Sequence, residues 1–309
     1  MSQLLNIVRE SGLKAIPQRL WYVQRKRGLR ERIRRQYGTS TDPEVREVMA
    51  FLTAHPSQEL PMGMIPPYDW TRDYSPELIS IGRDPGNGLL CVKVKEHKVY
   101  FPRRFSPAEV QRAVSIGLME QDGRSPHCYV GKGFTVDDGD VAGFIGASDG
   151  LFCLSLVNQL SKAYLFEPNS DWHEPLRSTF APWGNRVEIV PLAVGSKDGE
   201  GRTRLDTFFK ERPPPNYMQV DVDGVEQAVL EGANCLLRNA AKLRLSICTY
   251  HKRLDFQKFE QLLGGLEYSI HHSPGFFLIG VRMPYLRRGI LYASRGMAQP
   301  AFPAPPASE

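Results

Sequence analysis

The sequence has few cysteines, and they are far apart. Their number is odd and none belongs to a Cys-x-x-Cys pair: Cys91, Cys128, Cys153, Cys235 and Cys248. A scattered, odd set argues against a disulfide framework and against a zinc site built on closely spaced cysteines. We expect most of the cysteines to be small buried side chains in a reducing compartment.

Long apolar runs are also missing. No stretch approaches the 18 apolar residues that indicate a membrane span. The first 18 residues lack an apolar core followed by a small-residue cleavage site, so no secretory signal is predicted. With 41% hydrophobic and 24% charged residues in 309, the composition is that of an ordinary globular protein, and we expect it to be cytoplasmic.

Positive charge is concentrated at the N-terminal end. Residues 1–40 carry ten Lys/Arg and two Glu, a net charge of +8, whereas the whole chain carries +5. A basic end on a near-neutral remainder indicates a local patch. It is either a helix packed on the body or a contact for an anionic surface, such as lipid headgroups or an acidic glycan precursor. The sequence shows no nucleic-acid-binding motif, so we expect no nucleic-acid partner.

The first third of the chain is predicted to be mainly helical. Residues 41–44 read Thr-Asp-Pro-Glu, which is typical of a helix start. Residues 89–102 predict two short strands around a turn at 96–97. We interpret residues 1–116 as a basic helical extension with a small β-hairpin. At the other end, residues 296–309 are rich in Pro and Ala and are predicted to be disordered.

Residues 117–295 are interpreted as one domain, in which short apolar runs alternate with amphipathic segments. Five runs are predicted strands: 141–145, 162–166, 187–190, 217–221 and 242–248. Strands that alternate with helices predict an α/β fold, with a doubly wound, Rossmann-like and mostly parallel sheet covered on both faces. Residues 268–272 and 276–281 are expected to add a terminal antiparallel strand pair.

The residues that follow the first two strands suit a nucleoside ligand. The turn at 145–150 contains two glycines, which allow close backbone approach and lead into a helix N-terminus. The same glycines also suit a purely structural turn. Glu167 follows the second strand, 21 residues after Gly146. An acid there can accept hydrogen bonds from both ribose hydroxyls, although a solvated loop acid would look the same.

Ionisable side chains also follow the fourth and fifth strands. Asp221 and Asp223 end the fourth strand, and His251 with Lys252 follow the fifth. In α/β proteins such positions face the crevice in which ligands bind. Two structural interpretations stay open: Asp223 is also a suitable helix N-cap, and a lone histidine is common without a catalytic role.

Taken together and in this order, the segments resemble the FkbM-type methyltransferases. The resemblance covers about residues 117–290 and is carried by GDVAGFIGASDG, AYLFEPNSDW, YMQVDVDGVEQAVLEGA and LSICTYHKRLDF. It implies a class I methyltransferase sheet that binds S-adenosylmethionine. It also implies methylation of a hydroxyl, often on a sugar, a glycan or a secondary metabolite, so the expected partner is a small-molecule or glycan acceptor.

The resemblance also assigns residues to roles. The glycine turn would lie along the methionine part of the cofactor: Gly146, Ala147, Ser148, Asp149 and Gly150. Glu167 would hold the ribose, and four residues would border the adenine: Pro168, Asn169, Ala193 and Val194. Asp221 and His251 would face the methyl-transfer site, with His251 as the base and Lys252 beside it for an acidic acceptor. Methyl transfer of this kind needs no metal, and we expect none.

Three positions depart from the family pattern. Phe144 stands where the family has an acid, Gln219 where a lysine is common, and Asp223 where it has a glutamate. Phe144 therefore favours one alternative, a catalytically impaired binding protein on the same fold. A nicotinamide-dependent oxidoreductase is the other alternative, although the turn does not read G-x-G-x-x-G.

Overall fold

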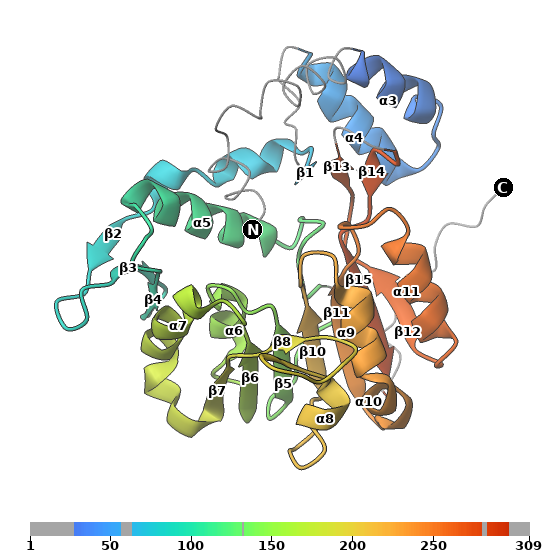
Figure 1. Ribbon diagram of the computed structural model, residues 1–309. Helices are drawn as coiled ribbons and strands as arrows, with labels where there is room; N and C mark the ends of the chain where they lie inside the picture. Colours follow the sequence, from blue (N-terminus) through green and yellow to red (C-terminus); the bar gives the residue numbers. More distant parts are fainter. Residues whose placement is uncertain (1–27, 57–63, 132, 280–282, 297–309) are drawn as a thin grey trace.

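The computed structural model describes residues 28–56, 64–131, 133–279 and 283–296. At its centre is a seven-stranded sheet in the order β12-β15-β11-β10-β5-β6-β7 (Figure 1). The bounds of these strands are β5 Val141–Ile145, β6 Lys162–Phe166, β7 Val187–Val190, β10 Tyr217–Val220, β11 Leu243–Cys248, β12 Ser269–His272 and β15 Ile290–Arg295.

The strand directions define the fold. β7, β6, β5, β10 and β11 run parallel to one another, whereas β15 lies between β11 and β12 and runs antiparallel to both. The chain therefore leaves β5 toward β6 and β7, and later returns to β10 on the other side. This reversal creates a switch point between β5 and β10, where open α/β sheets bind ligands. The predicted doubly wound, Rossmann-like and mostly parallel sheet is confirmed.

Burial explains why these runs form strands. Every residue of β10 and β11 is buried, as expected for parallel strands that helices cover on both faces. Successive strand residues point to opposite faces. Thus Phe144 belongs to the hydrophobic cluster on one face of the sheet, and Ile145 to the cluster on the other. The covering helices are α6 Leu151–Leu156, α7 His173–Phe180, α8 Leu205–Phe208, α9 Glu226–Gly232, α10 Asn234–Asn239 and α11 Asp255–Gly264.

The predicted partners of the terminal strand pair were wrong. β12 pairs with β15, with Ile270 opposite Ala293, and not with the run that follows it. That run forms β13 (Phe277–Ile279), which belongs to a separate sheet with β1 (Met64–Ile65) and β14 (Leu286–Arg287). The β13–β14 pair is thus an insertion between two neighbouring strands of the main sheet. Sequence order suggested adjacency because consecutive strands usually pair.

The helices α3 (Leu29–Tyr37) and α4 (Pro43–Ala54) pack on this insertion. Asp42 caps α4 by accepting a hydrogen bond from the backbone N–H of Glu44 at 2.9 Å. A third hydrophobic cluster joins these helices to the β13–β14 insertion, and it includes Leu29, Ile33, Val48, Leu278 and Leu286. The carboxylate of Glu44 also forms an ion pair with Arg288, directly after β14. Figure 1 shows both helices beside β13 and β14.

The predicted hairpin forms with one further strand. β2 (Ile81–Arg83), β3 (Leu90–Val94) and β4 (His97–Tyr100) make an antiparallel sheet. Its apolar residues belong to the same hydrophobic cluster as residues of α7. The helix α5 (Pro107–Glu120) runs across residue 116, the predicted end of the N-terminal extension. The extension proposed at 1–116 is thus joined to the rest through shared cores. Residues 1–27 of the basic segment and 297–309 of the predicted tail lie outside the described residues.

The remaining elements are short. They are the 3₁₀ helices η1 Asp69–Asp73, η2 Pro76–Leu78, η3 Ser170–Trp172 and η4 Ala181–Arg186, and the strands β8 Ala193–Val194 and β9 Arg202–Thr203. Within the described part of the chain, no helix has both the length and the apolar character needed to cross a membrane.

Candidate functional site

The ends of β5 and β10 meet in a close backbone contact. Gly146 has φ +86°, and a Cβ atom placed on it would lie 1.9 Å from the carbonyl oxygen of Asp221. No side chain fits there, so only glycine allows the turn after β5 to pass over the end of β10. This contact places the glycine turn and the Asp221 backbone side by side at the switch point.

The second glycine of the turn packs on a helix. Gly150 has φ +74°, and a Cβ atom there would lie 2.7 Å from the ring of Phe180 in α7. The backbone N–H groups of Gly146 and Ala147 both donate to the carbonyl of Phe166, at 3.0 and 3.1 Å. Both glycines are therefore required by close contacts within the protein itself. These contacts fix the course of the turn beside the end of β6.

Glu167 is locked against this turn. Its Oε2 accepts a hydrogen bond from the backbone N–H of Ser148 at 2.9 Å, and its Oε1 accepts one from Asn169 at 2.8 Å. The residue is only 7% exposed. Burial raises the pKa of Glu167, and the two backbone donors partly oppose the rise. Each carboxylate oxygen has a second acceptor site, so the group can also receive two hydroxyl donors.

Phe144 occupies the position at which the family has an acid, and Asp149 is an acid in the turn that follows β5. Phe144 is 1% exposed and packs against Phe152 and Tyr217, with ring centroids 5.8 and 6.4 Å away. It is a core residue beneath the turn. Asp149 is partly exposed and accepts a hydrogen bond from the N–H of Leu151 at 2.9 Å. Burial raises the pKa of Asp149 to about 7.

The four residues predicted to border the adenine lie in two places. Pro168 and Asn169 are exposed directly after Glu167, where Asn169 caps η3. Ala193 and Val194 form β8, which pairs in parallel with β9. Val194 is buried and belongs to the same cluster as Phe166, the residue before Glu167. Their contact with a ligand stays a prediction.

Asp221 is held by two donors on one oxygen. The hydroxyl of Tyr129 donates to Oδ2 at 2.7 Å, and Nε2 of His127 lies 3.4 Å from the same atom. Burial raises the pKa of Asp221, but the hydrogen bond and charge of His127 and the charge of His251 outweigh it and hold the pKa below its ordinary value. Asp221 is therefore an anion throughout the physiological pH range.

The sequence analysis missed His127. It lies in the loop before β5, is 2% exposed, and has its Nε2 2.8 Å from the hydroxyl of Tyr250. Burial lowers the pKa of His127, but the carboxylates of Glu120 and Asp221 more than offset this, and the pKa is raised overall. Tyr250 and Asp221, with which it interacts, are distant in sequence, and the loop does not follow a strand whose end would mark it. His127 lies in the segment EQDGRSPHCYV, within the stretch 117–290 that resembles the family, but the resemblance assigned this segment no role.

His251 lies at the end of β11 and faces three carboxylates. Its Nδ1 lies 2.8 Å from Oε1 of Glu226, and its Nε2 lies 3.8 Å from Oδ1 of Asp221 and 3.8 Å from Oδ1 of Asp223. The predicted pair Asp221 and His251 is thus brought together. Glu226, the first residue of α9, is the other residue that the sequence analysis missed.

The loop that carries His251 is fastened to the β13–β14 insertion. Nη1 of Arg287 donates to the carbonyls of Tyr250 and His251, at 2.8 and 3.2 Å. Lys252 is exposed, and its backbone N–H donates to Asp255 at 3.0 Å. Its side chain is therefore exposed next to His251 in the sequence. The insertion and the helices packed on it adjoin the predicted methyl-transfer site.

Two groups of side chains have the composition of a metal site. They are His127 with Asp221 and Cys248, and Asp221 with Glu226 and His251. In the second group, however, Oε1 of Glu226 already accepts from Nδ1 of His251. In the first, Nε2 of His127 pairs with Tyr250. In both groups a candidate ligand nitrogen therefore already lies within hydrogen-bond distance of another side chain, and the expectation that no metal binds stays a prediction.

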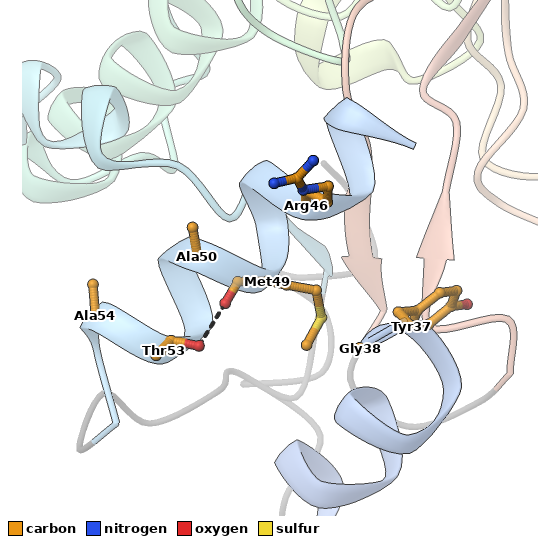
Figure 2. A pocket seen from close by; sticks show the side chains of 7 residues that line it. All are labelled: Tyr37, Gly38, Arg46, Met49, Ala50, Thr53 and Ala54. Atoms are coloured by element: carbon orange, nitrogen blue, oxygen red, sulfur yellow. Dashed lines mark hydrogen bonds between the residues drawn. The ribbon is translucent and has the colours of Figure 1, made fainter. Parts of the chain in front are cut away.

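A surface pocket lies elsewhere, over α3 and α4. Figure 2 shows its lining: Tyr37, Gly38, Arg46, Met49, Ala50, Thr53 and Ala54. None of the residues assigned to the cofactor or to methyl transfer lines this pocket. It is therefore separate from the site at the strand ends.

No protein-family model matches this sequence, and no curated protein matches it. Solved structures with a similar fold include a methyltransferase FkbM from Methylobacillus flagellatus, with 16% sequence identity and a TM-score of 0.43. That similarity covers 60% of this chain and 54% of the other, so the chain spans about half the length of that protein. It is a protein of the family that the sequence motifs resemble.

Two further solved structures are an rRNA methylase from Streptococcus thermophilus and a candidate methyltransferase from Streptococcus mutans in complex with SAH. The first has 15% identity and a TM-score of 0.37, and the similarity covers 52% of this chain and 88% of that one. The second has 12% identity and a TM-score of 0.34, and covers 52% and 90%. The fold assignment itself follows from the strand order and directions described above.

Proposed function

We propose that this protein is an S-adenosylmethionine-dependent methyltransferase that methylates a hydroxyl of a sugar, a glycan or a secondary metabolite. The observation that carries the proposal is the position of Glu167. It is a buried carboxylate at the end of β6, bonded at 2.9 Å to the glycine turn that follows β5. An acid fixed at this point of a doubly wound sheet suits the two hydroxyls of a ribose.

The residues present fit the cofactor. The acceptor sites left on Glu167 match two ribose hydroxyls, and Pro168 and Asn169 are exposed beside it for the base. When bound, S-adenosylmethionine supplies an electrophilic methyl group for an in-line displacement. The task of the chain is to align the acceptor oxygen with that methyl and to accept the proton of the hydroxyl.

His251 is the proposed base. Glu226 accepts only, so the neutral imidazole has its proton on Nδ1 and a free lone pair on Nε2. Nε2 faces Asp221, which is anionic and stabilises the imidazolium that forms. Lys252, exposed next to His251, is proposed to attract an acidic acceptor.

The contact of residues 1–40 with an anionic surface also stays a proposal. In the described part of this segment, Leu29 and Ile33 of α3 pack into the core, whereas Arg34 and Arg35 are exposed. The helix thus joins the body through its apolar side and presents cations outward. We propose that these cations contact acidic lipid headgroups or an acidic glycan, and that nucleic acid is not a partner.

Calorimetry with two ligands tests the function. We expect S-adenosylhomocysteine to bind and a nicotinamide dinucleotide not to bind. The reverse result would favour the oxidoreductase alternative. Cofactor binding without methyl transfer to any acceptor would favour the impaired binding protein that Phe144 suggests.

A further inference from the structure

Glu226 is buried at the site and concentrates three donors on one oxygen. Its Oε1 lies 2.8 Å from Nδ1 of His251, and it also accepts the backbone N–H groups of Gly224 at 3.1 Å and Val222 at 3.3 Å. The residue is 0% exposed. A charged acceptor with several donors makes strong, well-oriented hydrogen bonds. Glu226 thus ties the loop after β10 to the histidine that follows β11.

This contact determines which nitrogen of His251 can take up a proton. Nδ1 must donate to Glu226, because a carboxylate has no proton to give. Nε2 points toward Asp221 and Asp223, but both distances are 3.8 Å and exceed hydrogen-bond length. Nε2 is therefore the nitrogen left to react.

We propose that Glu226 is a positioning residue of the methyl-transfer site, which holds His251 with Nδ1 protonated and Nε2 ready to accept a proton. The inference rests on the proposed function, in which His251 is the base. In the reaction, the acceptor oxygen bonds to the methyl carbon, and the carbon–sulfur bond breaks with its electron pair passing to sulfur. The hydroxyl proton passes to Nε2, and the carboxyl group of Glu226, hydrogen-bonded to Nδ1, stabilises the resulting imidazolium.

The charges around His251 support this role. Burial lowers the pKa of His251. The hydrogen bond to Glu226 and the carboxylates of Asp221 and Asp223 raise it by more, so the net pKa is above its ordinary value. Three basic side chains also lie near the ring: His127 on the far side of Asp221, Lys252 on the same loop, and Arg287 on β14, which bonds to the loop carbonyls. The carboxylates outweigh them, because the net pKa of His251 is raised.

The test is Glu226→Gln, followed by nuclear magnetic resonance titration of the histidine rings in the full-length protein. Glutamine keeps the size and one acceptor oxygen but removes the charge. We expect the His251 pKa to fall by about one unit or more, because a nearby opposite charge typically shifts a pKa by 1–3 units. The wild-type ring should show the Nδ1-protonated tautomer. His251→Ala assigns the signal.

Two variants complete the experiment. Glu226→Asp keeps the charge, so it should retain most of the raised pKa even if the glutamine variant folds poorly. Glu231→Gln, at an exposed position of the same helix, should leave the pKa unchanged. With an acceptor in hand, the midpoint of the kcat/KM profile should move to lower pH in Glu226→Gln by the same amount as the pKa.

An unchanged His251 pKa in folded Glu226→Gln, or an Nε2-protonated ring in the wild type, would overturn the inference. Failure of the proposed function would look different. In that case S-adenosylhomocysteine would not bind to the wild type, whatever the titration of His251 shows.

Discussion

Gly146 and Asp221 are in backbone contact: a methyl group on Gly146 would lie 1.9 Å from the carbonyl oxygen of Asp221. The contact joins the turn expected to carry the cofactor to the strand end expected to carry the chemistry. It requires a residue without a side chain and with a positive φ of 86°. The geometry of the proposed site therefore depends on this glycine.

Gly146→Ala should destabilise the fold and weaken cofactor binding, because the turn must move away from β10. Gly139→Ala is the matched control, since Gly139 also has a positive φ, +83°, but nothing lies within 4 Å of an added Cβ. The control should cost only the backbone strain of about 1–2 kcal/mol. Chemical denaturation should show a larger loss for Gly146→Ala. Equal losses in the free energy of unfolding would mean that the turn can move away from β10 without destabilising the fold, and would contradict this prediction.

Phe144→Asp tests whether the missing acid can be restored. The family resemblance alone predicts tighter cofactor binding, but the Phe144 side chain lies in the core and packs against Phe152 and Tyr217. We expect a loss of at least about 3 kcal/mol in the free energy of unfolding, since losing a buried Phe costs 3–5 kcal/mol before any charge is buried. Phe144→Leu should cost less. A stable aspartate variant that binds cofactor more tightly would show that the core adapts to an acid here.

His251→Ala should lower turnover by roughly 10²-fold or more, because general base catalysis typically contributes 10²–10⁴. The affinity for S-adenosylhomocysteine should barely change. Full turnover in this variant, with loss only in Asp221→Asn, would transfer the role of base to Asp221. Loss of cofactor binding in both variants would mean that these side chains contact the cofactor.

Arg34 and Arg35 provide a test of the anionic-surface proposal. Replacing both by Gln should weaken binding to acidic liposomes at least tenfold at low salt, since each juxtamembrane cation contributes about 1 kcal/mol. Binding of the unaltered protein should fall as salt rises, because exposed charges are screened within about 10 Å at 0.1 M. Co-sedimentation with phosphatidylserine vesicles measures both effects. No binding by the full chain at low salt would defeat the proposal.

The local pattern of apolar and turn residues was sufficient to predict most strands of the central sheet. The first three strands occupy the predicted residues, because each is a short apolar run bounded by turn residues. β15 was not predicted. It pairs with β12 across the β13–β14 insertion, and the spacing of strands along the sequence does not show that strands on either side of an insertion are paired.

Residues of the candidate site could be predicted from the sequence only where a residue follows a strand. Glu167, Asp221 and His251 could be placed for that reason. His127 and Glu226 act through contacts 123 and 25 residues away in sequence, and no motif links either to its partner. Only the three-dimensional arrangement shows them.

The central claim is that Glu167 holds the ribose of S-adenosylmethionine, and calorimetric titration of S-adenosylhomocysteine tests it most directly. Each hydrogen bond to a charged group contributes roughly 1.5–3 kcal/mol. We predict measurable binding to the wild type and at least tenfold weaker binding to a folded Glu167→Ala variant, with Glu231→Ala as the exposed control that binds like the wild type. Equal affinity of Glu167→Ala and the wild type would contradict the account.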